Sequence, residues 1–463
     1  MKLGRAVLVI LTAVGAVGCQ ARDFSFWSRP PIRVGLLHSQ TGFLAETEQS
    51  MIDAEIMALE EINAAGGLLG GRRVEWTIAD GESEGVVFAR EARRLIKDQQ
   101  VRAIFGCYTS FSRKDTRPAV EDADGLLFYP AAYEGLEESP NVVYMGAAPN
   151  QQIIPTLKWA YDHLKVQSFF LVGVDSIYSH GLNAIVKDLI RSVSARVVGE
   201  EYLGFGGAGL DGVVAAIRKA QPDVVVSSLT GPVNATFHQR MRAAGSSSAE
   251  CPIISYTLDE ELIQKLAPAE VAGDYLTASY LQVIDTPENR AFVERFQARF
   301  GRDRVTSDLI ETAYNSVRLW ARTVQEAETD DPRSVRTLLG RQSLNAPEGI
   351  ISIDGATQHA WRPSFIGRVR PDRTVEIVWS SQTSIRPEPF PSSRTRADWN
   401  RILDQLYKRL GNRWLSPDQP ARFPERPRQS SAPAFSALKS TAGGDARPDR
   451  RFPPASKTPA KSR

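Results

Sequence analysis

The sequence contains few of the residues from which metal and redox centres are built. Three cysteines and five histidines occur among 463 residues, and the histidines are scattered rather than spaced like the ligands of a zinc ion. The chain also has no H-E-x-x-H motif and no nucleophile elbow. These absences argue against a hydrolase, and we expect neither a metal nor another cofactor.

Long hydrophobic runs are missing as well. The apolar segment Ala6–Val17 follows Lys2 and Arg5. It is shorter than the roughly 20 residues of a membrane-spanning helix and is typical of a secretory signal peptide. Ala16-Val17-Gly18-Cys19 is similar to a lipobox, which predicts cleavage before Cys19 and its lipidation. The alternative is an ordinary signal peptide followed by a chance cysteine. We expect a signal peptide over 1–19 and an envelope protein, lipid-anchored on the periplasmic or extracellular face of a membrane.

The other two cysteines, Cys107 and Cys251, lie in separate halves of the chain. A disulfide between them would join two regions that we expect to move relative to each other. We therefore predict that both are unpaired and buried as small apolar residues.

Charge is distributed unevenly. Residues 421–463 hold ten Lys or Arg and three Asp or Glu, a net +7, so the rest of the chain carries −5 of the total of +2. This tail is rich in Pro, Ser and Ala, which predicts disorder. Two interpretations remain open: a solvated extension, or a segment that binds anionic lipid or another polyanion of the envelope. We predict no nucleic-acid partner, a tether over 20–31 and a C-terminal extension over 392–420.

Between these ends, short apolar runs alternate with amphipathic helical patterns. This alternation predicts βαβ units and doubly wound α/β sheets. Antiparallel strands are expected near the end, with Asp372-Arg373 as a turn. The predicted strands lie at 32–38, 73–79, 102–106, 125–129, 142–145, 169–174, 197–202, 224–229, 253–256, 349–353, 362–370 and 374–379, and the predicted helices include 155–163, 182–193, 210–220, 288–300 and 308–328.

Several long motifs resemble one family: the solute-binding proteins for urea and short-chain amides, including the amide sensor of amidase operons. The motifs are Gly106–Lys114, Leu127–Glu137, Asp285–Asn289, Ala346–Gly349 and Ile385–Phe390. The resemblance implies a type I periplasmic-binding-protein fold over 32–391, with two lobes joined by a multi-crossover hinge. It places lobe 1 at about 32–152 and 278–345, and lobe 2 at about 153–277 and 346–391. It also implies a small neutral polar solute bound between the lobes and ABC permease subunits as partners.

Loops at the carboxyl edges of parallel strands are the expected binding site. Urea and acetamide need donors for an oxygen, acceptors for NH₂ groups and a flat apolar wall. The Ser110 hydroxyl can donate and accept, and the Thr109–Ser110 amides suit the carbonyl. Tyr108 and Tyr129 suit the wall, and carbonyls near Pro130 and Ala131 suit the NH₂. Loops ending later strands are secondary candidates, for which a purely structural role is the alternative. The predicted ligand-binding residues are Tyr108, Thr109, Ser110, Tyr129, Pro130, Ala131, Ser176, Tyr178, Thr230, Gly231, Thr257 and Asp259.

Two departures from the family pattern affect the ligand. Ser176 stands where the family commonly has a tyrosine that reaches the ligand, and Ala131-Ala132 replaces a bulkier pair. The sequence therefore predicts a larger or wetter pocket, in which Tyr178 is a candidate replacement.

Other features admit more than one interpretation. Arg113-Lys114 is an anion site, a solvated helix start or a partner surface. For Glu134 and Glu137 we favour a helix start over a carboxylate pair. Residues 204–209 match G-x-G-x-x-G, for which we favour a flexible loop over a dinucleotide site.

Three classes of function follow. The first is a receptor that delivers urea or a short amide to an ABC permease. The second is an envelope sensor whose lobe closure controls a regulatory partner. The third, an amidohydrolase, lacks a recognisable catalytic motif.

Overall fold

The computed structural model describes residues 30–416. The predicted signal peptide, Cys19, most of the tether and the basic tail lie outside these residues. Within them, none of the helices combines the length and the apolar character needed to cross a membrane. The described chain forms two α/β lobes, each built on its own sheet. The predicted fold class is thereby confirmed.

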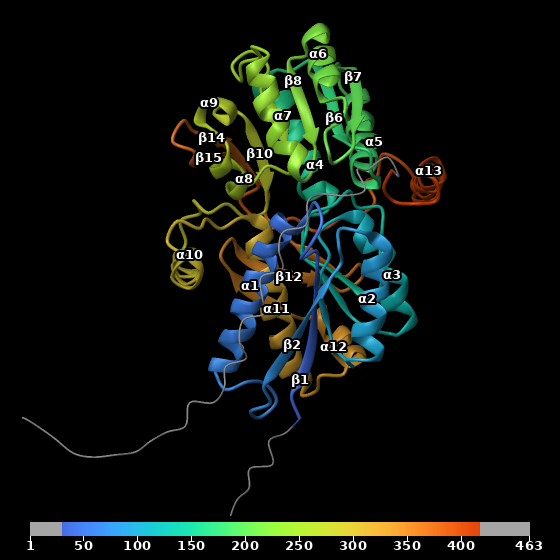
Figure 1. Ribbon diagram of the computed structural model, residues 1–463, viewed down its shortest axis with the longest axis vertical. Coiled ribbons are helices and arrows are strands. Elements are labelled where there is room, and N and C mark those ends of the chain that lie inside the picture. Colours follow the sequence, from blue (N-terminus) through green and yellow to red (C-terminus); the bar gives the residue numbers. More distant parts are fainter. Residues whose placement is uncertain (1–29, 417–463) are drawn as a thin grey trace, which may run out of the picture. The chain divides into compact units, whose positions relative to one another are not determined.

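Lobe 1 is built on an eight-stranded mixed sheet (Figure 1). Its parallel part forms because consecutive short apolar strands are joined by helices. An antiparallel meander of β11, β12 and β13 extends it from the β5 edge. The strand order is β11-β12-β13-β5-β4-β3-β1-β2, with β1 (Ile32–His38), β2 (Val74–Asp80), β3 (Ile104–Gly106), β4 (Leu127–Tyr129), β5 (Val142–Tyr144), β11 (Ser343–Ala346), β12 (Gly349–Asp354) and β13 (His359–Trp361).

Helices cover both faces of this sheet. In α2 (Gly85–Lys97), Phe88, Ala92 and Leu95 recur at helical spacing and are buried against the sheet. The opposite face carries α1 (Ala45–Ala64) and α11 (Asp308–Ala327), which contact each other around buried Trp320. The remaining helices of this lobe are α3 (Ser110–Asp122), α10 (Pro287–Phe300) and α12 (Pro332–Leu339).

Lobe 2 is built on a seven-stranded sheet in the order β15-β14-β10-β9-β8-β6-β7. The strands are β6 (Ser168–Val174), β7 (Arg196–Leu203), β8 (Val224–Ser228), β9 (Ile253–Ser255), β10 (Tyr275–Ala278), β14 (Phe365–Val369) and β15 (Val375–Ser380). The last two pair antiparallel, as predicted. The helices are α4 (Ile153–Trp159), which continues into a π-helical turn over Ala160–Leu164, α5 (Ile177–Arg191), α6 (Leu210–Ala220), α7 (Pro232–Ala243), α8 (Glu260–Lys265), α9 (Pro268–Val271) and α13 (Arg396–Arg409).

Within residues 30–416 the chain passes between the two sheets three times: after β5, after β10 and after β13. The first passage includes a short 3₁₀ turn at Pro149–Gln151. The predicted boundary at residue 346 is wrong, because β12 and β13 belong to lobe 1. They pair with β11 and, through His359 and Tyr144, with β5. The chain therefore returns to the second lobe only at about residue 362.

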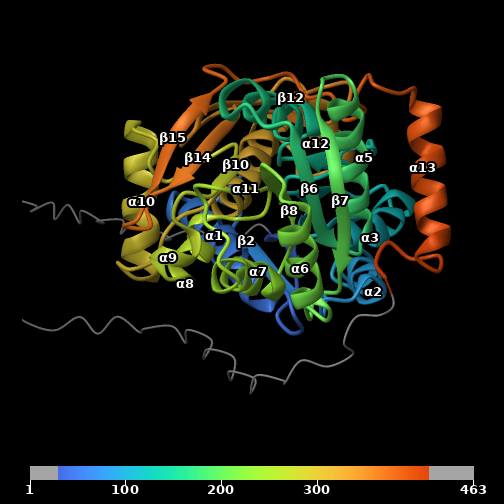
Figure 2. The ribbon, with the colours of Figure 1, turned by 90° about the horizontal axis from the view of Figure 1, so that it is seen from above.

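Five helices of the described residues were not predicted: α7, α8, α9, α12 and α13. Helix α13 lies in the segment expected to be an extension, beside α5 of lobe 2 (Figure 2). Its Trp399 and Leu403 are buried in the core of that lobe. Cys107 and Cys251 are unpaired and buried, as predicted.

Candidate functional site

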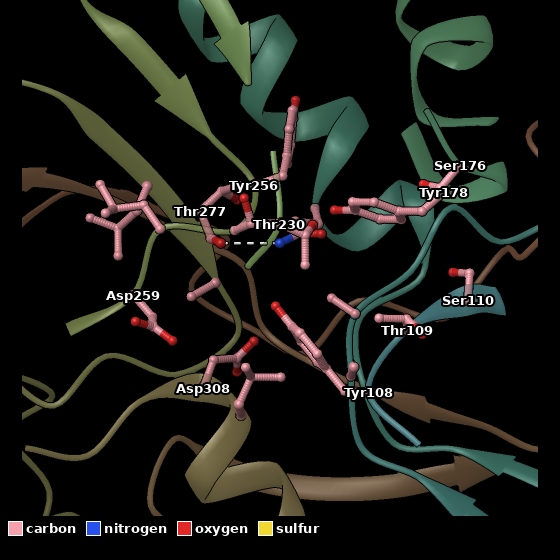
Figure 3. Close-up of a pocket in the computed structure, with 18 of the residues that line it drawn as sticks. Tyr108, Thr109, Ser110, Ser176, Tyr178, Thr230, Tyr256, Asp259, Thr277 and Asp308 are labelled. Carbon is pink, nitrogen blue, oxygen red and sulfur yellow. Dashed lines mark hydrogen bonds between the residues drawn. The ribbon is translucent and has the colours of Figure 1, made fainter. Parts of the chain in front are cut away.

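A cavity lies between the lobes, at the carboxyl ends of strands from both sheets, with an empty volume of about 790 Å³ including its open mouth. Figure 3 shows Ser110 and Thr109 on the same side as Ser176 and Tyr178, with Asp259 and Asp308 opposite. The lining residues are Tyr108, Thr109, Ser110, Phe111, Tyr129, Ala131, Ala132, Gln152, Ser176, Tyr178, Phe205, Thr230, Tyr256, Thr257, Leu258, Asp259, Glu260, Leu276, Thr277, Ala278, Asp308 and Leu309.

The cavity brings together ten of the twelve residues predicted to bind ligand. The other two, Pro130 and Gly231, are not among its lining residues. Pro130 is buried directly after β4. Gly231 precedes α7 with a positive φ of 76° and faces Phe205 and Leu44. Tyr178 does line the cavity, beside Ser176.

Sequence reasoning missed several lining residues. Gln152 lies in the first passage between the lobes and donates to the Thr277 carbonyl oxygen at 3.1 Å, the bond drawn in Figure 3. Asp308 begins α11 and belongs to a later part of the chain. Tyr256 directly precedes Thr257 at a strand end, so its position alone was a usable signal. The sequence around Asp308 and Gln152 contained no such signal, because these residues reach the cavity only through the passages of the chain between the lobes.

The amino end of α3 supplies donors to the cavity. Thr109 is the N-cap, and its hydroxyl accepts from the Ser112 amide at 3.2 Å. The Ser112 hydroxyl in turn accepts from the Thr109 amide, also at 3.2 Å. The first amides of a helix have no intrahelical acceptor, and this capping box satisfies two of them. Ser110 and Phe111 line the cavity, and their amides have no acceptor within residues 30–416.

Behind this end lies a buried ion network. Arg113 is fully buried, and its Nε donates to Glu137 Oε1 at 2.8 Å. Lys114 Nζ donates to the other oxygen of Glu137, also at 2.8 Å. The expectations of a solvated helix start at Arg113-Lys114 and of a helix start at Glu134 and Glu137 are therefore wrong. The irregular segment after β4 folds back and neutralises both cations.

Three carboxyl groups line the opposite side. Asp259 is the N-cap of α8 and accepts from the Leu262 amide at 2.8 Å. Glu260 accepts from the Gln282 amide at 2.8 Å. Burial raises the pKa of Asp259, raises the pKa of Glu260 to about 8 and raises the pKa of Asp308 to about 6. In the described part of the chain, no lysine or arginine lines the cavity.

Four tyrosines add flat walls. The Tyr129 hydroxyl donates to the Tyr108 carbonyl oxygen at 2.9 Å, and the Tyr256 hydroxyl donates to the Ile153 carbonyl oxygen at 3.3 Å. The hydroxyls of Tyr108 and Tyr178 have no such bond within residues 30–416. They are available to a ligand, and burial raises the pKa of each well above the ordinary value, so both remain donors.

The lobes meet across the cavity mouth. Ser50 Oγ of α1 donates to Glu261 Oε1 of α8 at 2.7 Å, and Arg304 lies 3.6 Å from the same oxygen. The rings of Phe43 and Phe205 stand 4.2 Å apart between centroids. The structure is therefore a form in which the lobes are in contact.

The glycine-rich loop and the segment after α13 lie next to the cavity. Residues 204–209 connect β7 to α6 and border a separate surface hollow; from this loop, only Phe205 reaches the cavity. The segment that follows α13 runs beside Ser176, where the Ile177 amide donates to the Trp414 carbonyl oxygen at 2.9 Å.

Comparisons with known proteins identify the family of this chain. The family model for the periplasmic binding protein domain matches residues 32–396. The leucine-, isoleucine-, valine-, threonine- and alanine-binding protein of Pseudomonas aeruginosa is 21% identical over 335 residues, which is 70% of this chain and 86% of that protein. Limonene hydroxylase of Geobacillus stearothermophilus is 27% identical over 154 residues, 32% of this chain. The chain spans only 28% of that relative's length.

Solved structures share the fold. A solute-binding protein of an ABC transporter from Rhodopseudomonas palustris BisB5, in complex with 3,4-dihydroxybenzoic acid, superposes with a TM-score of 0.71 at 17% identity, covering 77% of this chain and 98% of that one. The branched-chain amino acid transporter substrate-binding protein of Streptococcus pneumoniae, in complex with isoleucine, gives a TM-score of 0.67 at 18% identity, covering 77% and 100%.

Proposed function

The chain belongs to the periplasmic binding protein family, and from this premise we propose that it captures urea or a short-chain amide between its lobes and delivers it to ABC permease subunits. Binding of a solute is common to the family. We propose in addition the ligand class, a lipid anchor at Cys19 and a permease partner.

One observation carries the ligand choice: the cavity offers amide donors on one side and carboxyl acceptors on the other, without a lining cation. The Ser110 and Phe111 amides suit a carbonyl oxygen, while Asp259 and Asp308 suit NH groups. A urea or amide molecule carries both kinds of group on a flat frame, and the Tyr108 and Tyr178 rings suit such a frame.

The same observation disfavours carboxylic acids such as those in the R. palustris complexes. A bound carboxylate would face Asp308, which a pKa of about 6 leaves ionised near pH 7, whereas Glu260, with a pKa of about 8, is protonated there. Among residues 30–416, no lysine or arginine lines the cavity to offset this charge. Charges of like sign in a partly desolvated cavity repel each other strongly.

A second ligand class is favoured by the relatives. The P. aeruginosa protein is named for the binding of amino acids, and an ammonium group would be attracted to the acidic side here.

The alternative role, an envelope sensor that signals through lobe closure, would use the same cavity.

Calorimetric titration of the protein lacking residues 1–19 tests the proposal. The ligands are urea, formamide, acetamide, butyramide and leucine. Saturable binding of urea or an amide, with leucine weaker, is the expected result. Tighter binding of leucine would replace the amide by an amino acid, and silence from folded protein would refute both ligand classes.

A further inference from the structure

We infer that Glu134 and Arg113 fix the Ser110 hydroxyl as a hydrogen-bond acceptor toward the cavity, so that the site selects a carboxamide and rejects the matching carboxylate. This inference rests on the proposed function, since it assigns a specificity role within the same cavity. Glu134 and Arg113 are positioning residues here, because they act on the ligand through Ser110.

The position of Arg113 is over-determined. Its guanidinium lies 4.6 Å from the ring centroid of Tyr129 and 4.4 Å from that of Tyr133. Nε is bonded to Glu137, while Nη2 lies 3.5 Å from Glu134 Oε1. A fully buried guanidinium held by two carboxylates and two rings has no room to change its orientation, and it has only donors to offer.

Glu134 is fixed from the other side of the interface. It is fully buried and packs against Gly181 of α5, where a Cβ atom would come within 2.9 Å of Glu134 Cγ. Only glycine leaves room for this approach. The Glu134 carboxylate is thus wedged between α3 of lobe 1 and α5 of lobe 2.

These two fixed groups settle the hydrogen bonding of Ser110. Its hydroxyl donates its single proton to Glu134 Oε2. One of its two lone pairs accepts from Arg113 Nη1 at 3.3 Å. A serine hydroxyl has one donor and two acceptor positions, so the group that Ser110 offers to the cavity is its second lone pair. The sequence leaves the Ser110 hydroxyl able to donate or to accept, and these two partners select the acceptor.

This polarity separates two ligands of nearly the same shape. The carboxamide oxygen accepts from the free amides at the start of α3, and its NH₂ donates to Ser110 Oγ. A carboxylate places an oxygen in both positions, and its second oxygen then faces a lone pair with the Glu134 carboxylate behind it. Leaving such a group unpaired typically costs about 1–3 kcal/mol, which corresponds to roughly 5- to 150-fold in affinity.

The test compares matched carboxamide and carboxylate pairs by calorimetry: acetamide with acetate, propionamide with propionate, and leucinamide with leucine. The key variant is Glu134→Gln. Because Arg113 has only donors, the Gln oxygen must face Arg113 and its NH₂ must face Ser110. The Ser110 proton is then released toward the cavity. The Kd ratio of carboxylate to carboxamide should fall by about tenfold or more.

Two further variants make the result decisive. Ser110→Ala removes the acceptor, so it should weaken carboxamides and leave carboxylates nearly unchanged. Glu121→Gln is the matched control, because Glu121 accepts from Ser139 Oγ at 2.7 Å on the same helix but outside the cavity. It should leave the ratio at its wild-type value.

The outcomes separate the two proposals. If the wild type binds carboxamides and neither Glu134→Gln nor Ser110→Ala changes the ratio, the assignment of Ser110 is overturned while the proposed function stands. If the wild type prefers the carboxylate members, or binds neither urea nor any member of a pair, the proposed function fails before any substitution is considered, and the assignment of Ser110 fails with it. If the wild type binds urea alone, the proposed function stands and the selection of carboxamides by Ser110 is overturned.

Discussion

Two helix starts face each other across the cavity, and they are built in opposite ways. Helix α3 of lobe 1 is capped by the hydroxyl of Thr109, and the amides of the lining residues Ser110 and Phe111 have no acceptor within residues 30–416. Helix α8 of lobe 2 is capped by the carboxylate of Asp259, which fills its own helix end. The first arrangement offers donors and the second offers acceptors. The polarity of a ligand is therefore set by which residue caps which helix.

The two sides also differ in what lies behind them. The α3 side stands on the buried network of Arg113, Glu134 and Glu137. On the α8 side, Glu261 instead contacts the other lobe, where it accepts a hydrogen bond from Ser50. We describe the α3 side as a fixed wall, because a buried ion network holds it in place. The α8 side instead belongs to the contact between the lobes. Four substitutions test this difference.

The largest effect is expected from Arg113→Met. Removal of the guanidinium leaves Glu134 and Glu137 buried, with Lys114 as the remaining cation. Loss of one partner from a buried ion pair typically destabilises a protein by about 3–5 kcal/mol. Urea denaturation should show a loss of this size. Arg117→Met, on the same helix in a partly exposed pair with Glu121, should cost under about 1 kcal/mol. Equal losses would contradict the fixed-wall description.

Asp259→Asn should weaken ligand binding more than it weakens the fold. Asparagine caps helices about as well as aspartate, so α8 should persist. Its oxygen would remain on the Leu262 amide and its NH₂ would face the cavity, replacing an acceptor by a donor. The Kd for urea or an amide should rise by roughly 5- to 150-fold. The exposed Asp285→Asn is the control, and an unchanged Kd for Asp259→Asn would remove this side from the site.

Lobe closure should depend on pH through Glu261. Burial raises its pKa to about 7 from an ordinary value of 4.5. Because closing buries Glu261 against Ser50, the closed form holds this proton more tightly than an open form. Affinity for urea, which does not titrate here, should therefore fall as the pH rises from 4.5 to about 7 and level off above that, by at most about tenfold per pH unit.

Glu261→Gln tests the assignment of this pH dependence. The glutamine cannot titrate, so the profile between pH 4.5 and 7 should become flatter. The exposed Glu294→Gln should keep the wild-type profile. Asp308, whose pKa is about 6, titrates in the same range in both proteins, so the ratio of wild-type to Glu261→Gln affinity isolates Glu261. A ratio that rises with pH would have the wrong sign for a carboxyl group that closure buries.

The smallest effect is expected from Trp414→Ala. This residue lies outside the part of the chain that the family model matches, and its ring stands 4.9 Å from Lys114 Nζ. It is half-buried, so its removal should lower the free energy of unfolding by about 1 kcal/mol. A decrease in the free energy of unfolding above about 3 kcal/mol would show that the segment around Trp414 is part of the core rather than an addition to it.

Much of the fold could be predicted from the sequence because its signals are local. Apolar runs such as Phe169–Val174 and helical spacing such as Phe88, Ala92 and Leu95 do not depend on distant residues. Ten of the predicted site residues line the cavity because loops at the carboxyl ends of parallel strands meet at one sheet edge. The motif resemblance supplied the two-lobed arrangement.

Other features depend on contacts between distant segments. The strand signals of β12 and β13 do not indicate to which lobe these strands belong. Only the pairing of β13 with β5, and of β12 with β13, places them in lobe 1. Gln152 and Asp308 reach the cavity because the chain passes between the lobes three times. Arg113 and Lys114 have the composition of a surface helix start, and nothing in their neighbourhood predicts burial.

The sequence by itself determined the two α/β lobes, the unpaired cysteines and most of the residues around the cavity, because periodicity and strand-end position are properties of short segments. Only the tertiary structure decided the polarity of the site. The direction of the Ser110 hydroxyl is set by Glu134, 24 residues away, and by the guanidinium of Arg113. A hydroxyl can donate or accept, and its choice is made by the partners that folding places around it.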